Sequence, residues 1–273
     1  MAITTFDGLI AAAKQFVDMV KTANRVTVQA AWFTLFDLAG NPGAGTLAGT
    51  STANGVVPTD LTTGFPVIDA FGGAATGVLA QVTFGNSVAC RMALYDLVFK
   101  AGAYAFGAGT TALSSQPSYA GRMPGGLYTD TQIWIEVTTA FVTGTAWQAQ
   151  VTYTNQDGVT GRTGVALPAT AAANLTLGRM YQLGLQAGDS GVQKIESVIV
   201  TNGGTAMTAG AFNVLVMRRL WSGRVRGVND GSLNGPQETL MPQIMADSAL
   251  YLILSTDSTA SGVPELGLVI ANG

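Results

Sequence analysis

The chain of 273 residues lacks the side chains on which most catalytic sites at neutral pH depend. It contains no histidine and a single cysteine, Cys90. Histidine is the only side chain whose unperturbed pKa lies near neutrality, so its absence excludes Ser-His-Asp and Cys-His nucleophile activation and His-ligated zinc. One cysteine forms neither an intramolecular disulfide nor a thiolate cluster, and the apolar stretch around Cys90 is typical of a protein core. These absences predict a protein that is not an enzyme and that uses no cofactor or metal.

Sixteen acidic residues remain as candidates for carboxylate chemistry, and they are spread thinly along the chain. Most lie at predicted turns or caps, where Asp hydrogen-bonds the nearby backbone; examples are Asp60, Asp130, Asp157, Asp189 and Asp257. Glu136 lies in the middle of a predicted strand, and we expect it to be exposed or paired. Two acids from distant loops would suffice for glycoside hydrolysis, so the pattern leaves that alternative open.

Two short strings imitate motifs that bind nucleotides or carry a nucleophile. Gly43–Gly49 (GAGTLAG) resembles a dinucleotide fingerprint, but its spacing is one residue too long and no helix pattern follows it. Gly188–Gly191 (GDSG) places a serine between small residues but is not GxSxG. We interpret the first string as a flexible loop and the second as a turn.

The one concentrated charged feature is a basic segment that also contains Trp221. It holds four of the thirteen basic residues: Arg218, Arg219, Arg224 and Arg226. Such a segment could contact nucleic acid, but the planar guanidinium group also suits carboxylates on an adjacent subunit. Because the formal net charge of the chain is −3, we favour a subunit interface and expect no nucleic-acid partner.

The composition predicts a protein that associates with other protein subunits. Charged residues make up 11% of the chain, against about 25% in an average soluble protein. A monomer with so little charge is prone to associate, so we expect much of its surface to be hidden in interfaces. No run of about 18 apolar residues exists, and the N-terminus lacks a basic segment before an apolar one. We therefore expect a soluble protein, made in the cytoplasm, with no membrane partner.

The first element that positions these residues is a predicted amphipathic helix. Apolar residues recur at steps of three and four on one face: Phe6, Leu9, Ile10, Ala13, Phe16, Val17 and Val20. This stripe needs a partner, either the body of the chain or a neighbouring subunit. The candidate interface residues are therefore Phe6, Leu9, Ile10, Phe16 and Val17, together with the four arginines.

Beyond Arg25 the pattern predicts strands rather than helices. Residues that are β-branched, aromatic or alternately apolar and polar predict them over Val26–Phe36, Val78–Phe84, Val88–Phe106, Ile133–Thr138, Trp147–Thr154, Ile195–Thr201, Phe212–Leu220, Leu250–Leu254 and Leu266–Ala271. Short strands joined by Gly-rich turns favour a sandwich over βαβ units. The fold class is therefore mainly β, with antiparallel sheets like those of a β-sandwich or jelly roll, an N-terminal amphipathic helix and a long Gly-rich loop.

The predicted organisation has three parts. Residues 1–24 form an N-terminal helix or arm, residues 25–125 an N-terminal β region, and residues 126–273 a C-terminal β-sandwich domain. The β region contains an extended loop over residues 39–64. A structureless segment of that length is uncommon unless it is functional or packs on a partner, so we interpret it as an arm or interface loop.

Several strings resemble a family of capsid-associated virion proteins of tailed bacteriophages. They are Thr4–Leu9 (TTFDGL), Tyr153–Gly158 (YTNQDG) with Gly161-Arg162, Leu185–Val192 (LQAGDSGV), Val214–Leu220 (VLVMRRL) and Ile270–Gly273 (IANG). The strings are short but span most of the chain, and none is a catalytic signature. The resemblance implies a component of the phage head, made in the host cytoplasm.

Within that resemblance, the role implied is that of a cement or decoration protein, which stabilises the head by binding between major capsid subunits. Its partners would be the major capsid protein and copies of itself, as a trimer. The alternatives are the major capsid protein, which usually shows a long charged spine helix, and a tail, baseplate or fibre subunit. A carbohydrate-binding β-sandwich is an alternative of another class, because four tryptophans could stack on glycans; they are Trp32, Trp134, Trp147 and Trp221.

Overall fold

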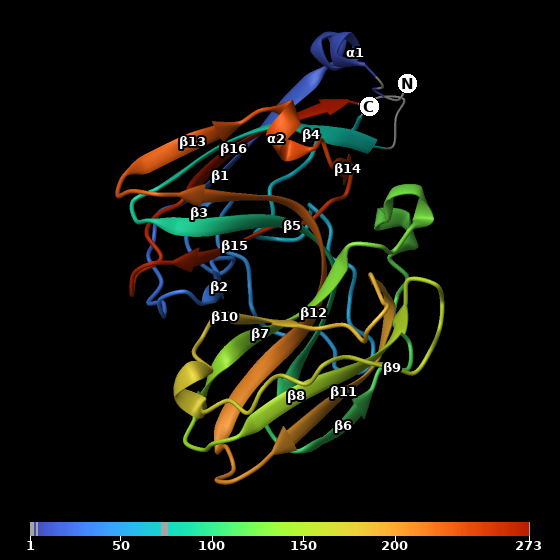
Figure 1. Cartoon of the computed structure of the whole chain (residues 1–273), viewed down its shortest axis with the longest axis vertical. Coiled ribbons are helices and arrows are strands. Elements are labelled where there is room, and N and C mark those ends of the chain that lie inside the picture. Colours follow the sequence, from blue (N-terminus) through green and yellow to red (C-terminus); the bar gives the residue numbers. More distant parts are fainter. Residues whose placement is uncertain (1–2, 4, 72–75, 273) are drawn as a thin grey trace. The chain divides into compact units, whose positions relative to one another are not determined.

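The computed structural model describes residue 3, residues 5–71 and residues 76–272, and within them the chain is mainly β, as the sequence predicts (Figure 1). The strands are β1 Lys14–Lys21, β2 Trp32–Thr34, β3 Gly40–Asn41, β4 Thr76–Asn86, β5 Cys90–Ala105, β6 Gly109–Ala112, β7 Thr131–Val142, β8 Trp147–Asn155, β9 Arg162–Thr163, β10 Arg179–Leu183, β11 Val192–Asn202, β12 Ala209–Val225, β13 Asp230–Asn234, β14 Gln243–Met245, β15 Leu250–Thr256 and β16 Glu265–Asn272. The helices are short: α1 Phe6–Ala11, α2 Pro236–Thr239, and the 3-10 turns η1 Ala120–Arg122, η2 Pro124–Gly126 and η3 Ala172–Asn174. Thr4, the first residue of the string TTFDGL, and Gly273, the last residue of IANG, lie outside the described residues.

The chain divides into two compact units that alternate along the sequence. Unit 1 comprises Met1–Thr46, Thr59–Asp96 and Leu220–Gly273, and unit 2 comprises Leu47–Pro58 and Leu97–Arg219. Strands β5 and β12 each begin in one unit and end in the other. The boundary predicted near residue 125 falls inside unit 2, within the turn-rich segment that holds η1 and η2.

Unit 1 is built from antiparallel strands around its own core. One sheet has the order β13-β4-β16-β1-β3, with β14 paired to β4. Strand β15 pairs with β2 on one side and with the first part of β5 on the other. Apolar side chains of both groups, such as Leu79, Leu268 and Leu254, belong to one buried cluster. Cys90 is buried in this cluster, as the sequence predicts.

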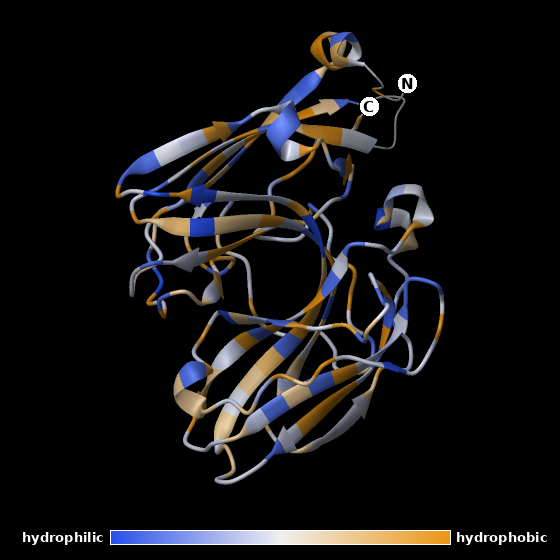
Figure 2. Ribbon diagram, in the orientation of Figure 1, coloured by the Kyte–Doolittle hydropathy of each residue, from blue (hydrophilic) through white to orange (hydrophobic). Residues whose placement is uncertain are grey.

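Unit 2 has a second, separate core between two layers of antiparallel strands. One layer is the sheet β6-β11-β8-β9, and the other contains β7 paired with β12 and β10. The buried cluster takes Val151 and Ile195 from the first layer and Ile135 and Val214 from the second. Polar and apolar residues alternate along β8, so one face of the strand points inward (Figure 2).

The N-terminal helix is much shorter than the sequence predicts. The helix α1 ends at Ala11, and the expected second half is strand β1. Strand β1 pairs along its length with β16, so Val17 and Met19 point into the core of unit 1 at a spacing of two residues. The apolar residues of this segment fit both the 3.6-residue period of a helix and the two-residue period of a strand. Pairing with β16 stabilises the strand instead of the helix.

Two further predictions need correction. Only Trp32–Thr34 of the expected strand Val26–Phe36 is a strand, because the chain turns at Ala30, whose φ is 59°. The loop over residues 39–64 is irregular apart from β3, as expected, but its second part is not a free arm. The segment Leu47–Pro58 belongs to unit 2, where Val56 exchanges two backbone hydrogen bonds with Lys100 and Gly49 lies directly against the backbone of Gly102 and Ala103.

Candidate interaction surface

The structure divides the candidate interface residues into buried and exposed groups. Leu9 packs with Ala80 and Ala271, and Val17 lies in the core of unit 1, so neither side chain faces a partner. The exposed fractions of Phe6, Ile10 and Phe16 are instead 66%, 61% and 76%. These three apolar side chains remain available at the surface.

Helix α1 is held in place at both of its ends. The Thr5 hydroxyl accepts a hydrogen bond from the Gly8 N–H, as expected of an N-cap residue. The Lys14 ammonium donates to the carbonyl oxygens of Ile10 and Ala12, at 2.8 and 2.9 Å, and so satisfies the last turn. Phe6 and Ile10 are therefore presented to solvent by a capped helix rather than by a loose chain end.

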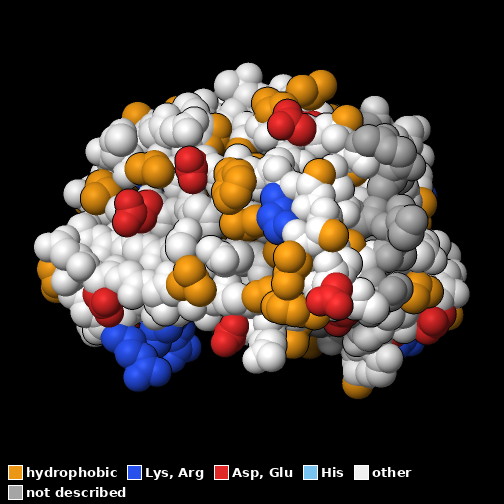
Figure 3. Space-filling model, turned by 90° about the horizontal axis from the view of Figure 1, so that it is seen from above, with side chains coloured by type: hydrophobic (Ala, Val, Ile, Leu, Met, Phe, Trp, Pro, Cys, Tyr) orange, Lys and Arg blue, Asp and Glu red, His pale blue; other side chains and the backbone are white. Residues whose placement is uncertain are grey.

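Phe6 lines a hollow in the surface of unit 1 together with residues of α2 and the turn after it. The hollow has a volume of about 520 Å³ and is lined by Phe6, Pro236, Gln237, Glu238, Leu240 and Met241. We call it the α1–α2 hollow. Figure 3 views the molecule from above and shows scattered apolar side chains among uncharged side chains and backbone, with few charged side chains.

Two of the lining residues adopt a backbone conformation that L-residues with large side chains avoid. Leu240 has φ 57° and Met241 has φ 44°, and such left-handed conformations raise the energy by about 1–2 kcal/mol per residue. Leu240 is nevertheless 84% exposed. Strained backbone that holds an apolar side chain in water is typical of functional surfaces. The sequence reasoning missed this pair, because nothing in their spacing distinguishes them from core residues.

The four arginines of the basic segment do not form one surface. Arg218 is buried, whereas Arg219, Arg224 and Arg226 are exposed. Arg224 lies 3.6 Å from a carboxylate oxygen of Asp257 within the same unit. Arg218 and Arg219 are adjacent in β12 and so point to opposite faces of the strand, whereas Arg226 lies beyond its end.

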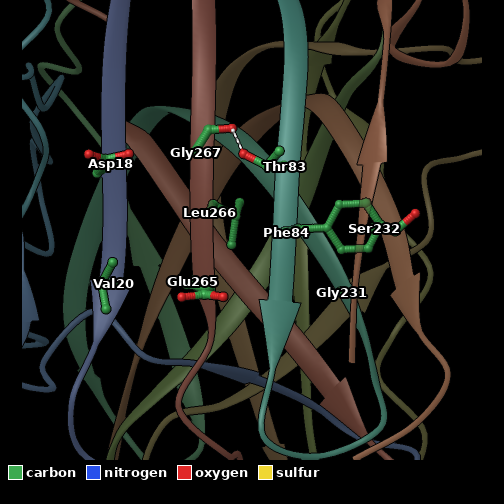
Figure 4. A pocket seen from close by; sticks show the side chains of 9 residues that line it. All are labelled: Asp18, Val20, Thr83, Phe84, Gly231, Ser232, Glu265, Leu266 and Gly267. Carbon is green, nitrogen blue, oxygen red and sulfur yellow. Dashed lines mark hydrogen bonds between the residues drawn. The ribbon is translucent and has the colours of Figure 1, made fainter. Parts of the chain in front are cut away.

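A shallow groove on unit 1 is lined by two carboxylates. It lies over β13, β4, β16 and β1, has a volume of about 360 Å³, and includes Asp18 and Glu265 (Figure 4). Both acids are exposed, so water solvates each of them. Paired catalytic carboxylates normally occupy contrasting environments, one apolar and one polar. The groove therefore gives no support to glycoside hydrolysis.

The strings YTNQDG and LQAGDSGV, which carry the resemblance, meet around the carboxylate of Asp189 in unit 2. Oδ2 accepts hydrogen bonds from the Tyr153 hydroxyl at 2.7 Å and from Arg162 Nε at 2.9 Å, and Oδ1 accepts one from Asn155 Nδ2 at 2.8 Å. The Arg162 hydrogen bond, assisted by those from Asn155 and Tyr153, lowers the pKa of Asp189 to about 2. We call these four residues the Asp189 clasp.

The Asp189 clasp joins two turns that the sequence predicts. The Gly158 N–H donates to the Asn155 carbonyl in the first turn, and the Asp189 N–H donates to the Gln186 carbonyl in the second. The Gln186 N–H donates in turn to the Tyr153 hydroxyl. Every member thus connects neighbouring chain segments, and the Ser190 side chain has no role in the clasp. The hydrogen-bonded turn covers Gln186–Asp189, so the GDSG string begins within the predicted turn, and Gly191 at its end forms an isolated bridge with Thr129.

Glu136 and three tryptophans are buried. This decides whether Glu136 is exposed or paired, and whether these tryptophans could stack on glycans. Glu136 is 1% exposed and accepts a hydrogen bond from Asn213, so it is paired. The exposed fractions of Trp134, Trp147 and Trp221 are 2%, 0% and 4%. None of these three indole rings offers a face to a glycan, and Trp32 is half-buried.

The part of the chain that the structure describes contains no cluster of metal-ligating side chains and no membrane-spanning helix. Over residues 5–71 and 76–272, no three Asp, Glu or Cys side chains gather closely enough to hold a metal ion. Over the same residues, every helix is too short to cross a bilayer.

Comparison with known proteins adds structural matches of low similarity. No family model matches the sequence, and no curated protein matches it. Among solved structures, the VP2 subviral particle of infectious bursal disease virus matches at 13% identity and a TM-score of 0.23, over 95% of this chain and 80% of that chain. The Gt strain of the same virus matches at 10% identity and a TM-score of 0.24, over 94% and 78% of the two chains. TM-scores of this size do not establish a common fold, so the function is argued from the residues of this chain.

Proposed function

We propose that this chain is a non-enzymatic structural subunit of a tailed-phage virion, a cement or decoration protein that binds between major capsid subunits of the head. The resemblance of its strings to capsid-associated phage proteins suggests the particle. The absence of histidine from the sequence and the low content of charged residues favour a structural role over a catalytic one.

The observation that carries the proposal is the α1–α2 hollow. Phe6 and Leu240 are mostly exposed although they are large and apolar, and Leu240 is held in a strained conformation. Contiguous apolar surface on a soluble protein marks an interaction site, and the centre of such a site is usually a few large side chains. A capsid subunit that inserts an apolar side chain between α1 and α2 would relieve this exposure.

The proposal also includes self-association into a trimer, which would place copies around local threefold axes of the shell. Light scattering of the purified chain at increasing concentration tests that part. A stable monomer at high concentration in the absence of capsids would contradict a trimer held by buried contacts between copies.

Binding of a Leu240→Asn variant to phage heads assembled without this chain tests the hollow. Asn tolerates the left-handed conformation, so the variant should fold with unchanged or slightly raised stability. We expect it to co-sediment with heads at least tenfold more weakly than the wild type. Leu127→Asn is the matched control, because Leu127 is 64% exposed, lies outside the hollow and has an ordinary φ of −91°.

Electron cryomicroscopy of the virion tests the position of the chain. Copies arrayed over the outside of the shell, distinct from the capsid lattice, are the expected result. Density confined to the tail or baseplate, or equal binding of the Leu240→Asn and wild-type chains to heads, would contradict the cement role.

A further inference from the structure

Three polar side chains lie together in the interior of unit 2, where most neighbours are apolar. Lys100 on β5, Glu136 on β7 and Asn213 on β12 are 7%, 1% and 0% exposed. Strand β12 lies between β5 and β7. The residues directly before and after each of the three belong to the large core cluster of unit 2. By strand alternation, the three polar side chains therefore share the opposite face of this layer.

The hydrogen bonds of Asn213 fix the orientation of its amide. Asn213 and Glu136 are direct cross-strand partners, and Nδ2 of the amide donates to Glu136 Oε2 at 2.8 Å. Nδ2 also donates to the Leu47 carbonyl oxygen at 2.8 Å. Since both partners are acceptors, the nitrogen of the amide must face them. The carboxyl group of Glu136 thus lies within proton-transfer distance of the amide nitrogen.

The carbonyl oxygen of the same amide is buried with no hydrogen-bond partner. It faces the backbone of β5, because a Cβ atom on Gly102 would lie only 2.2 Å from Asn213 Oδ1. Gly102 is two residues from Lys100, so the two positions share a face of β5. An amide that lacks one of its hydrogen bonds is less stabilised in its ground state than one that is fully paired.

Lys100 interacts electrostatically with Glu136. The negative charge of Glu136 raises the pKa of Lys100, but burial lowers it by more, so the pKa of this ammonium group falls below its usual range. A lysine amine is a nucleophile only when it is unprotonated, and desolvation is the common way to reach that state.

The segment Leu47–Pro58 covers this site and keeps water away from it. The Leu47 carbonyl oxygen contacts Asn213, and the backbone of Val56 exchanges hydrogen bonds of 2.8 and 3.0 Å with Lys100. Exclusion of water prevents hydrolysis from competing with attack by an amine. The segment Leu47–Pro58 therefore contacts two of the three polar residues as well as packing on unit 2.

We infer that Lys100 and Asn213 form an intramolecular isopeptide bond, with Glu136 as the proton-transfer group. The neutral Lys100 amine attacks Cγ of Asn213, and the new C–N bond replaces the bond from Cγ to Nδ2. The carboxyl group of Glu136 receives a proton from the attacking nitrogen and delivers one to Nδ2, which leaves as ammonia. One amide replaces another, so the reaction needs neither an oxidant nor a reductant, and Glu136 is regenerated.

The bond would join β5 to β12 and close a long loop of the chain. A covalent bridge of this kind restricts the unfolded chain, as a disulfide does, and the effect grows with the length of the loop that it closes. The chain has one cysteine and so no intramolecular disulfide. Lysine and asparagine supply a bridge that a reducing environment leaves intact.

The intact mass of the purified full-length chain tests this inference. We expect the mass to be lower than that of the unmodified chain by one ammonia. A tryptic digest should contain a branched peptide that joins the segments around Lys100 and Asn213, with no cleavage after Lys100. The full unmodified mass in a folded sample would overturn the inference.

Two variants separate the isopeptide bond from other losses of ammonia. Asn213 alone can lose ammonia by forming a succinimide with its own backbone, and that loss would persist in Lys100→Met. The isopeptide bond requires all three residues, so both Lys100→Met and Glu136→Gln should show the full unmodified mass. Glu136→Gln keeps an acceptor oxygen for Asn213 but transfers no proton. Loss of ammonia that persists in either variant, or a digest without the branched peptide, would overturn the inference.

Discussion

Two acid-centred clusters of unit 2 use the same kinds of side chain in opposite ways. In the Asp189 clasp, three donors saturate one carboxylate that lies between two turns. Around Glu136, the carboxylate lies in the middle of a sheet, next to a buried lysine and an amide whose oxygen has no partner. A saturated cluster holds the chain in one conformation, whereas a buried and incompletely paired one stores energy that a reaction can release.

The largest expected effect is that of Lys100→Met on the free energy of unfolding. The variant cannot form the isopeptide bond inferred above, and the loss of a native covalent bridge destabilises proteins by about 2–5 kcal/mol, as measured for disulfides. The midpoint of urea unfolding measures the change. The double variant Lys100→Met/Glu136→Met should recover only the part of the loss that comes from the buried carboxyl group, because it still lacks the bridge. If the single variant were as stable as the wild type, the Glu136 cluster would not differ from the Asp189 clasp in the way described above.

Asp189→Ala should have the next largest effect. The variant removes three hydrogen bonds to a carboxylate that is only 2% exposed, and we expect a loss of about 2 kcal/mol, since water can solvate the Arg162 that remains. Urea unfolding again gives the value. Asp157→Ala is the matched control in the neighbouring turn, because Asp157 is exposed and should change stability by less than about 0.5 kcal/mol.

The loss of folding stability at low pH should depend in part on the Asp189 clasp. The pKa of Asp189 falls from 3.8 to about 2 in the folded protein. Because the folded value is the lower one, the stabilisation is fully present above the unfolded pKa and is lost as the pH falls from 3.8 toward about 2. Unfolding midpoints of the wild type should therefore decline across this window. The Asp189→Ala variant should decline less steeply there, and an equal decline would contradict the assignment.

The smallest effect expected is that of Tyr153→Phe. The change deletes one of the three donors to Asp189 and the acceptor of the Gln186 N–H, while the ring stays in the core. We expect a loss of about 1 kcal/mol and a rise in the pKa of Asp189, followed by NMR titration of its carboxyl carbon. An unchanged pKa would mean that Arg162 and Asn155 saturate the carboxylate without the tyrosine.

Much of the fold follows from local sequence patterns. Alternation in Trp147–Tyr153 predicted β8, and the NQDG and GDSG strings predicted the turns that the Asp189 clasp joins. The residues of the clasp are polar residues at turns, and the sequence indicates the turns without indicating that they meet. That meeting depends on the pairing of β8 with β11, which are separated by many residues.

The sequence by itself determined the composition, the mainly β class, the exclusion of His-dependent chemistry, and the position of most strands. Tertiary structure alone decided which side of an ambiguous segment became helix and which became strand, as Phe6–Ala11 and Lys14–Lys21 show. It also decided that Lys100, Glu136 and Asn213, far apart in the chain, share one dry face beneath the Gly-rich loop. The physical reason is that periodicity reports the neighbours within one element, whereas burial and pairing depend on strands that only the folded chain brings together.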